Sequence, residues 1–179
     1  MQFFIKTMKN IALVIVIFSI NITIVSAQKL KSNSIIKAKS ISYKTDTSSF
    51  GGMTVENERN VYRKKMPDPD GINVNIEKSD KVSTINAFKQ VFSDVRLHQL
   101  KNENITIMYY ISSSGKLLEV SFHLDKNTTI TAFELEGLEE AIKKDVSFKL
   151  SGRKIKPDGF FVWYQNVTFR KILDGTFPG

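Results

Sequence analysis

The chain has 179 residues, no cysteine and a formal net charge of +8. Without cysteine it forms no disulfide and has no thiolate that could act as a nucleophile or as a zinc ligand. A chain of this length is expected to fold as one domain whose stability comes from packing alone.

Residues 1–27 have the composition of a secretory signal peptide. Lys6 and Lys9 precede an apolar run at residues 11–25, and small residues follow where a signal peptidase would cut. The run is shorter than the roughly 20 apolar residues that span a membrane. We therefore predict cleavage after Ala27 and a soluble periplasmic or secreted protein, which contacts the membrane only through this segment before cleavage. An uncleaved membrane anchor is the alternative.

Basic residues are scattered along the mature sequence, with denser clusters at residues 59–65 and 149–156. We interpret them as a solvated surface, or as an attraction to an acidic envelope surface or partner. Nucleic-acid binding would require aromatic residues interleaved with such a stripe, and export argues against it. We predict no nucleic-acid partner.

Residues 28–80 form a polar segment with few periodic apolar positions. We predict that it is partly mobile, or that it forms one or two short strands joined by a turn at Gly51 and Gly52. A firm break follows at residues 66–71, where two prolines and an Asp-Gly pair favour a turn. The compact domain is expected to cover residues 81–179.

The break also contains oxygen ligands at spacings that partly match a calcium loop: Asp68, Asp70 and Asn73. A complete loop needs ligands at alternating positions and a glutamate at the twelfth, and Pro69 further spoils the pattern. We interpret the stretch as a turn and predict no metal site.

A first helix is predicted over residues 82–97. Its apolar residues recur at spacings of three and four, which places them on one helical face, and Ser83 or Thr84 supplies the cap. These apolar residues are Ile85, Phe88, Val91, Phe92 and Val95.

A β-hairpin is predicted over residues 105–124. Its first strand is rich in β-branched and aromatic residues, and Gly115 supplies the positive φ that a tight turn needs. In the second strand, alternate residues from Leu118 to Leu124 are apolar, so the hairpin has one apolar face.

A second helix is predicted to start at Thr131, where Thr131 and Glu134 have the spacing of a capping box. Its apolar residues lie at helical spacing, and the glutamates between them are expected on the solvated side. Those glutamates are Glu136, Glu139 and Glu140.

The last predicted element is a long strand over residues 160–169, after a connection that contains Gly152, Pro157 and Gly159. The complete pattern predicts an α+β fold. It consists of a small antiparallel sheet, made of the hairpin and the C-terminal strand, with both helices packed on one face.

The order of these elements, over about residues 103–171, resembles the TonB C-terminal domain family. The shared features are the turn at Ser114 and Gly115, the acidic Leu/Ala helix and a closing strand that ends in Val167, Thr168 and Phe169. The resemblance implies a TonB C-terminal-like fold. It also implies recognition of an extended peptide or another envelope protein at the sheet edge near the last strand. A membrane-anchored energy transducer is an alternative that it raises.

Sequence signatures of catalysis are missing. The chain has neither a Gly-x-Ser-x-Gly sequence nor a Gly-rich phosphate loop, and we interpret its two histidines, His98 and His123, as surface or capping residues. We therefore predict a protein that is not an enzyme and that binds no cofactor. The alternative is a periplasmic hydrolase or enzyme inhibitor that uses surface carboxylates with one of these histidines.

Aromatic residues alternate along the predicted strands. If the helices cover one face of the sheet, one set of large side chains lies outside this core and forms an exposed patch, unless the segment before Pro67 covers it. We predict a non-catalytic binding or scaffold protein of the bacterial envelope. The predicted partner-binding residues are Phe161, Trp163, Gln165, Val167 and Tyr110.

Overall fold

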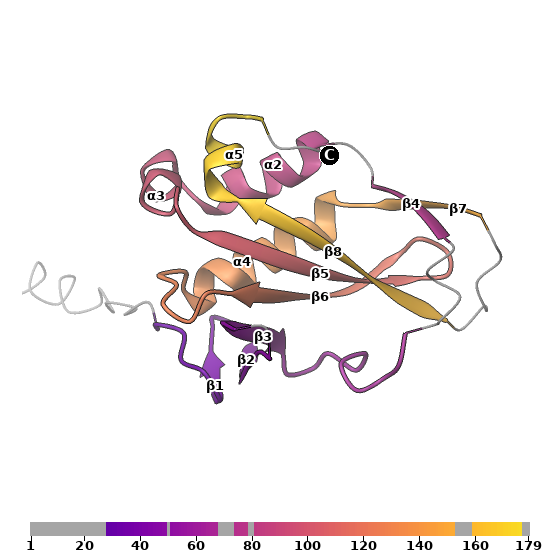
Figure 1. Ribbon diagram of the computed structural model, residues 1–179, viewed down its shortest axis with the longest axis horizontal. Coiled ribbons are helices and arrows are strands. Elements are labelled where there is room, and N and C mark those ends of the chain that lie inside the picture. The colour runs from indigo at the N-terminus through magenta and orange to yellow at the C-terminus, as the bar shows by residue number, and fades with distance from the viewer. Residues whose placement is uncertain (1–27, 50, 68–73, 79–80, 153–158, 177–179) are drawn as a thin grey trace, which may run out of the picture.

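The structure is a computed structural model that describes residues 28–49, 51–67, 74–78, 81–152 and 159–176. It contains a six-stranded antiparallel sheet of order β1-β2-β3-β6-β5-β8, with helices along one face (Figure 1). The predicted α+β class is confirmed. The predicted signal peptide and the turn at Asp68 and Asp70 lie outside the described residues.

The predicted hairpin and C-terminal strand form one half of the sheet. β5 (Asn104–Ser112) and β6 (Leu117–Leu124) are joined by a turn at Gly115, which has φ of +84°. A Cβ added at Gly115 would lie 2.5 Å from the carbonyl oxygen of Phe148, so glycine is required here for space as well as for φ. β8 (Phe160–Thr168) pairs with β5 along its whole length.

The N-terminal segment supplies the other half of the sheet. β1 (Ser34–Lys37), β2 (Ser42–Thr47) and β3 (Met53–Asn57) form a meander, and Gly51 and Gly52 lie in the turn between β2 and β3. β3 then pairs antiparallel with β6. Three strands of the sheet therefore precede the first helix of the described residues.

Two helices lie side by side on the sheet, α2 (Lys81–Val91) and α4 (Ala132–Asp145), with the shorter α3 (Asp94–Gln99) and α5 (Phe169–Leu173) near one end (Figure 1). The single helix predicted over residues 82–97 is thus two helices. The interruption is at Ser93, whose side chain accepts a hydrogen bond from the Arg96 backbone N–H and starts a new helix.

The capping box predicted at the start of α4 is present. The backbone N–H of Glu134 donates to Thr131 Oγ1 (3.2 Å), and the backbone N–H of Thr131 donates to Glu134 Oε2 (2.8 Å). Two unpaired donors of the first helical turn are therefore satisfied within one short stretch of sequence.

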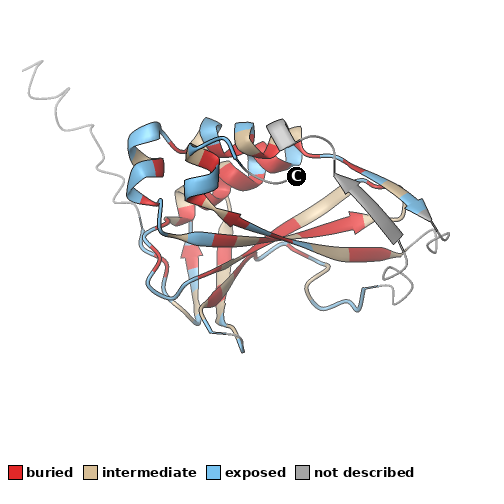
Figure 2. Cartoon of the chain, turned by 45° about the horizontal axis from the view of Figure 1, so that its top comes forward, coloured by how far each residue is buried: buried red, intermediate tan, exposed pale blue. Residues whose placement is uncertain are grey.

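The core lies between the helices and the sheet, where Figure 2 shows most of the buried residues. It is rich in aromatic residues from both halves of the chain. The ring of Phe169, at the start of α5, contacts Phe88 of α2 and Phe92, which directly follows α2. Its largest fully buried side chains include Tyr43, Tyr109, Phe88, Phe92, Phe122 and Phe169.

Two of the glutamates predicted on a solvated side of α4 are buried. Glu136 accepts hydrogen bonds from the backbone N–H groups of Lys39 (2.5 Å) and Ser40 (2.9 Å). Glu139 accepts from Asn57 Nδ2 (3.1 Å) and from Tyr43, among others. The prediction was wrong because these helical positions face the N-terminal strands and not water.

A small second sheet stands beside the main one. It pairs β4 (Val74–Lys78) with β7 (Phe148–Gly152), so the start of the predicted connection before β8 is a strand. Among the described residues, no helix combines the length and apolar character needed to cross a membrane.

Candidate functional site

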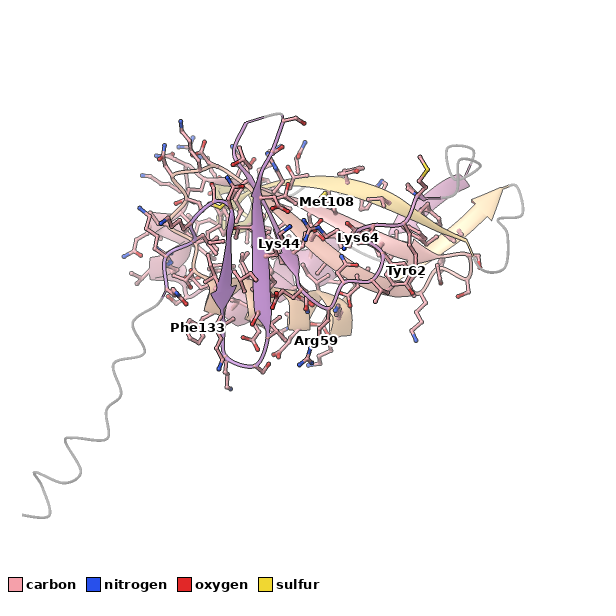
Figure 3. The ribbon with its side chains drawn as sticks, turned by 90° about the horizontal axis from the view of Figure 1, so that it is seen from below. Lys44, Arg59, Tyr62, Lys64, Met108 and Phe133 are labelled. Atoms are coloured by element: carbon pink, nitrogen blue, oxygen red, sulfur yellow. The ribbon has the colours of Figure 1, made fainter. Side chains whose placement is uncertain are left out.

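β8 lies at a border of the six-stranded sheet. Within the described part of the chain, β5 is the only strand that pairs with it. In Figure 3 it is the pale yellow strand along the outer side of the sheet. A border strand presents backbone N–H and C=O groups that can pair with another strand.

The backbone groups of β8 alternate between its two sides. Gly159 accepts through its carbonyl oxygen from the backbone N–H of Ser113, and the backbone N–H of Phe169 donates to the carbonyl oxygen of Glu103. Both contacts continue the β5–β8 register, so odd-numbered residues direct their backbone groups to β5. The even-numbered residues therefore direct theirs to the outer side: Phe160, Val162, Tyr164, Asn166 and Thr168.

The side chains of the odd-numbered residues lie on the helix-covered face. Phe161, Gln165 and Val167 are buried there. The half-buried Trp163 packs with its ring centroid 5.6 Å from that of Tyr109.

These four are predicted partner-binding residues, and as side chains they belong to the core side of the sheet. Gln165 Oε1 accepts a hydrogen bond of 2.8 Å from the Tyr109 hydroxyl, which further ties this set to β5. A partner at β8 would meet the outward backbone groups of the even-numbered residues and not the side chains of these four.

The opposite face of the sheet, called the second face below, is partly covered by the segment before Pro67 (Figure 3). The Tyr62 ring lies 6.3 Å from that of Tyr110 and 5.1 Å from that of Phe160. Tyr110, the fifth predicted partner-binding residue, is only 7% exposed for this reason. The segment before Pro67 thus covers one half of the second face, as the alternative stated above expects.

An ion cluster anchors the covering segment. Arg63 forms ion pairs with Asp46 on β2 and with Glu56 on β3, the latter at 2.5 Å. Burial raises the pKa of Glu56 above its ordinary value, and the positive charge of Arg63 opposes that rise. The cluster joins the covering segment to the N-terminal strands.

The other half of the second face is open and forms a groove of about 520 Å³. Tyr164, at the border of the groove, is 61% exposed. Met108, which Figure 3 labels, lies half-buried on the neighbouring strand β5. No hydrogen bond within the described part of the chain uses the side chains of Thr54, His123 or Tyr164. The groove is lined by Thr47, Ser48, Ser49, Thr54, Thr106, Met108, His123 and Tyr164.

A second opening of about 460 Å³ adjoins the groove and shares Thr106 and His123 with it. Glu103 and Asp125 also line this opening. The Glu103 carboxylate accepts from the backbone N–H (3.1 Å) and from the hydroxyl (2.8 Å) of Thr129. The glutamate therefore holds the loop before α4.

The two histidines considered as possible catalytic residues are not brought together. His98 is exposed on α3, away from the lining of both openings. In the parts of the chain that the structure describes, no three histidine or acidic side chains are grouped so that they could hold a metal ion.

The sequence-based prediction selected four odd-numbered residues of β8, whose side chains are buried or half-buried. The exposed side chains of this strand are those of Tyr164 and Asn166. The polarity of the side chains is the sequence signal that could have identified the exposed side of β8. From Val162 to Thr168, the even-numbered side of the strand includes a tyrosine, an asparagine and a threonine, which tolerate water better than Phe161 or Val167 do.

Comparison with known proteins supports the fold. The structure is similar to the crystal structure of a DUF5043 family protein from Bacteroides uniformis, with a TM-score of 0.62 and 13% sequence identity. The similarity covers 78% of this chain and 93% of that one. No protein-family model matches the sequence, and no curated protein matches it. At this level of identity the similarity shows a shared fold.

Proposed function

We propose that this protein is an exported, non-catalytic binding or scaffold protein of the bacterial envelope. In this proposal, an extended segment of a peptide or of another envelope protein adds to the sheet as a strand along β8. One observation carries the proposal: β8 is a nine-residue border strand whose even-numbered residues direct their backbone groups outward. Strand addition uses these groups for affinity and adjacent side chains for selectivity.

The resemblance to the TonB C-terminal domain family supports the same edge. That resemblance implies peptide recognition near the last strand, and here the last strand of the sheet is the border strand. The TonB C-terminal-like character of the fold is part of the proposal.

Side chains beside the edge would select the partner. Residues of an added strand alternate between the two faces of the sheet. Those on the second face would lie next to Tyr164 and Asn166, beside the groove that also contains Met108. A partner with apolar or hydroxyl side chains at every second position would fit this lining, which contains no aspartate, glutamate, lysine or arginine.

The test removes one outward backbone donor without disturbing the sheet. Val162→Pro deletes an N–H group that points away from β5, and proline is tolerated where a border strand faces outward. Val162→Thr keeps this N–H group and the β-branched shape, so it is the matched control. Both variants should be screened with the wild type against a displayed library of random peptides.

We expect the wild type and Val162→Thr to select the same peptides, and Val162→Pro to lose at least about tenfold in affinity for them. Bound peptide should protect the amide hydrogens of Tyr164 and Asn166 from exchange, because these amides point outward. Equal affinity of all three proteins, or protection confined to residues outside β8, would refute strand addition at this edge.

A hydrolase or enzyme inhibitor is the second candidate. It is favoured by the opening in which His123 lies with Glu103 and Asp125, since a histidine and an acid are a common pair in hydrolysis. The Glu103 carboxylate is already engaged by hydrogen bonds from the backbone N–H and the hydroxyl of Thr129. Turnover of ester, peptide or glycoside substrates that is lost in His123→Ala would establish this candidate in place of the binding protein.

A further inference from the structure

We propose that, when no other partner is bound, two copies of this protein pair antiparallel through β8 about a two-fold axis at Tyr164. This inference rests on the proposed function in one respect, that the outer side of β8 is open to an added strand. It goes further by naming the strand that occupies it, which is β8 of a second copy.

β8 itself carries none of the sequence features that protect a sheet border from pairing. β8 has the sequence Phe-Phe-Val-Trp-Tyr-Gln-Asn-Val-Thr, with no charged residue, proline or glycine in its nine positions. Natural proteins prevent edge-to-edge pairing with charges, prolines, bulges or short strands on the border. The opposite border follows that rule: β1 has four residues, ends in Lys37 and is followed by the exposed Lys39.

The distribution of charge also favours pairing along this border. The formal net charge of +8 falls to +6 once residues 1–27, with Lys6 and Lys9, are removed, and a net positive charge disfavours the approach of two copies. Like charges placed opposite each other across a strand pair are destabilising. A border of nine uncharged residues is a surface along which two copies can approach without that penalty.

β8 can also pair with a second copy of itself over its whole length. Tyr164 is the central residue of Phe160–Thr168, and an axis at Tyr164 is the arrangement that pairs all nine residues. Val162 then lies opposite the partner's Asn166, and Tyr164 lies opposite the partner's Tyr164. These residues are even-numbered, so their outward N–H and C=O groups meet and form the hydrogen-bonded pairs of an antiparallel ladder.

Side chains add to this pairing on both faces. On the second face the 61% exposed ring of Tyr164 would contact the partner's Tyr164, because Cβ atoms of directly paired residues are about 4.5 to 5.5 Å apart. On the helix face the half-buried Trp163 would lie opposite the partner's Gln165. Both aromatic residues thereby lose exposed apolar surface.

Such a pair would also regulate the proposed binding. The same outward groups of β8 cannot serve a second copy and an envelope partner at once. Binding of a partner strand would therefore compete with self-pairing, and its apparent affinity would fall as protein concentration rises.

The absence of cysteine permits a direct test by disulfide formation. In a hydrogen-bonded antiparallel pair the Cα atoms are about 5.5 Å apart, which is within the range of a disulfide. Under mild oxidation, Tyr164→Cys should therefore give a covalent dimer. Val162→Cys is the matched control, because the two copies of residue 162 would lie about 14 Å apart along the strands.

A mixture of two cysteine variants tests the register of the proposed β8 pair. Val162→Cys and Asn166→Cys should each stay monomeric on a non-reducing gel, whereas an equimolar mixture of the two should form a heterodimer. Light scattering of the wild type should give twice the mass of one chain, and Tyr164→Lys should halve it because two lysines would face each other.

Three outcomes would overturn the inference: a monomeric wild type, equal cross-linking of Tyr164→Cys and Val162→Cys, or no heterodimer in the mixture. If peptide binding in the same experiments is still lost in Val162→Pro, strand addition stands and only self-pairing fails. If Val162→Pro binds peptides as the wild type does, the proposed function fails independently.

Discussion

The hydroxyl of Tyr43 donates a hydrogen bond of 2.8 Å to the carboxylate of Glu139, across 96 positions of sequence. Both residues are buried, and the bond joins β2 to α4. Burial and the negative charge of Glu139 raise the pKa of Tyr43. The hydroxyl therefore keeps its proton to a higher pH than the hydroxyl of an exposed tyrosine does.

Tyr43→Phe should lower the free energy of unfolding by about 1.5 to 3 kcal/mol, because it removes one donor from a buried charged group while keeping the ring. Tyr164→Phe is the matched control, since its hydroxyl makes no hydrogen bond in the described part of the chain, and it should change stability by less than about 0.5 kcal/mol. Urea unfolding followed by circular dichroism measures both. Equal losses of stability in the two variants would mean that the Tyr43 hydroxyl does not stabilise the buried carboxylate of Glu139.

Trp163→Ala should destabilise the fold by an amount near the lower end of the roughly 3 to 5 kcal/mol that a core tryptophan contributes. The reason is that Trp163 packs against Tyr109 and Phe148, with ring centroids at 5.6 and 5.8 Å, yet stays half-exposed. The adjacent Tyr164→Ala removes a similar ring from the exposed face and should have little effect on thermal unfolding. A stable Trp163→Ala protein would place this side chain outside the core.

Gly115→Ala should be more destabilising than Gly175→Ala. Both glycines have positive φ, +84° and +67°, so both alanines meet the backbone strain of about 1 to 2 kcal/mol. Only at Gly115 does the added Cβ also approach the carbonyl oxygen of Phe148, whereas nothing lies within 4 Å at Gly175. Thermal melting of the two variants separates strain from steric clash, and equal losses would show that β7 can move aside.

Glu56 should make the wild type less stable as pH rises from about 4 toward neutrality. Burial raises its pKa in the folded state above the ordinary value of 4.5, so the unfolded chain releases this proton first. The contribution is complete below pH 4.5 and is lost as pH rises through the folded pKa. In Glu56→Gln this loss should vanish, which urea unfolding at a series of pH values would show. A wild type that gains stability relative to the variant over this range would mean that Arg63 outweighs burial.

Local patterns predicted the elements whose signals lie close together in sequence. The β5–β6 hairpin, the capping box of Thr131 and Glu134, and the long strand β8 each depend on a few neighbouring residues. The division between α2 and α3 is also local, but Ser93 was not recognised as a new cap because the apolar spacing continues through it.

Long-range pairing was not predictable in this way. Nothing near Met53 or Val55 indicates that β3 pairs with β6, about 70 residues later. Since that pairing was unknown, the glutamates of α4 had no visible partner and were interpreted as solvated. The candidate site shows the same limit, because the odd-numbered side of β8 is buried only once α2 and α4 are in place.

The two borders of the six-stranded sheet differ in a way that limits growth. In a dimer paired through β8, the β8 border of each copy is occupied. The free border of each six-stranded sheet is then β1, which is four residues long and ends in Lys37. If two copies pair through β8 as proposed, assembly would therefore close at two chains instead of continuing into a fibre. The N-terminal meander would then prevent the addition of further chains at this border. A chain without β1, β2 and β3 would expose β6 as a second long border and could polymerise.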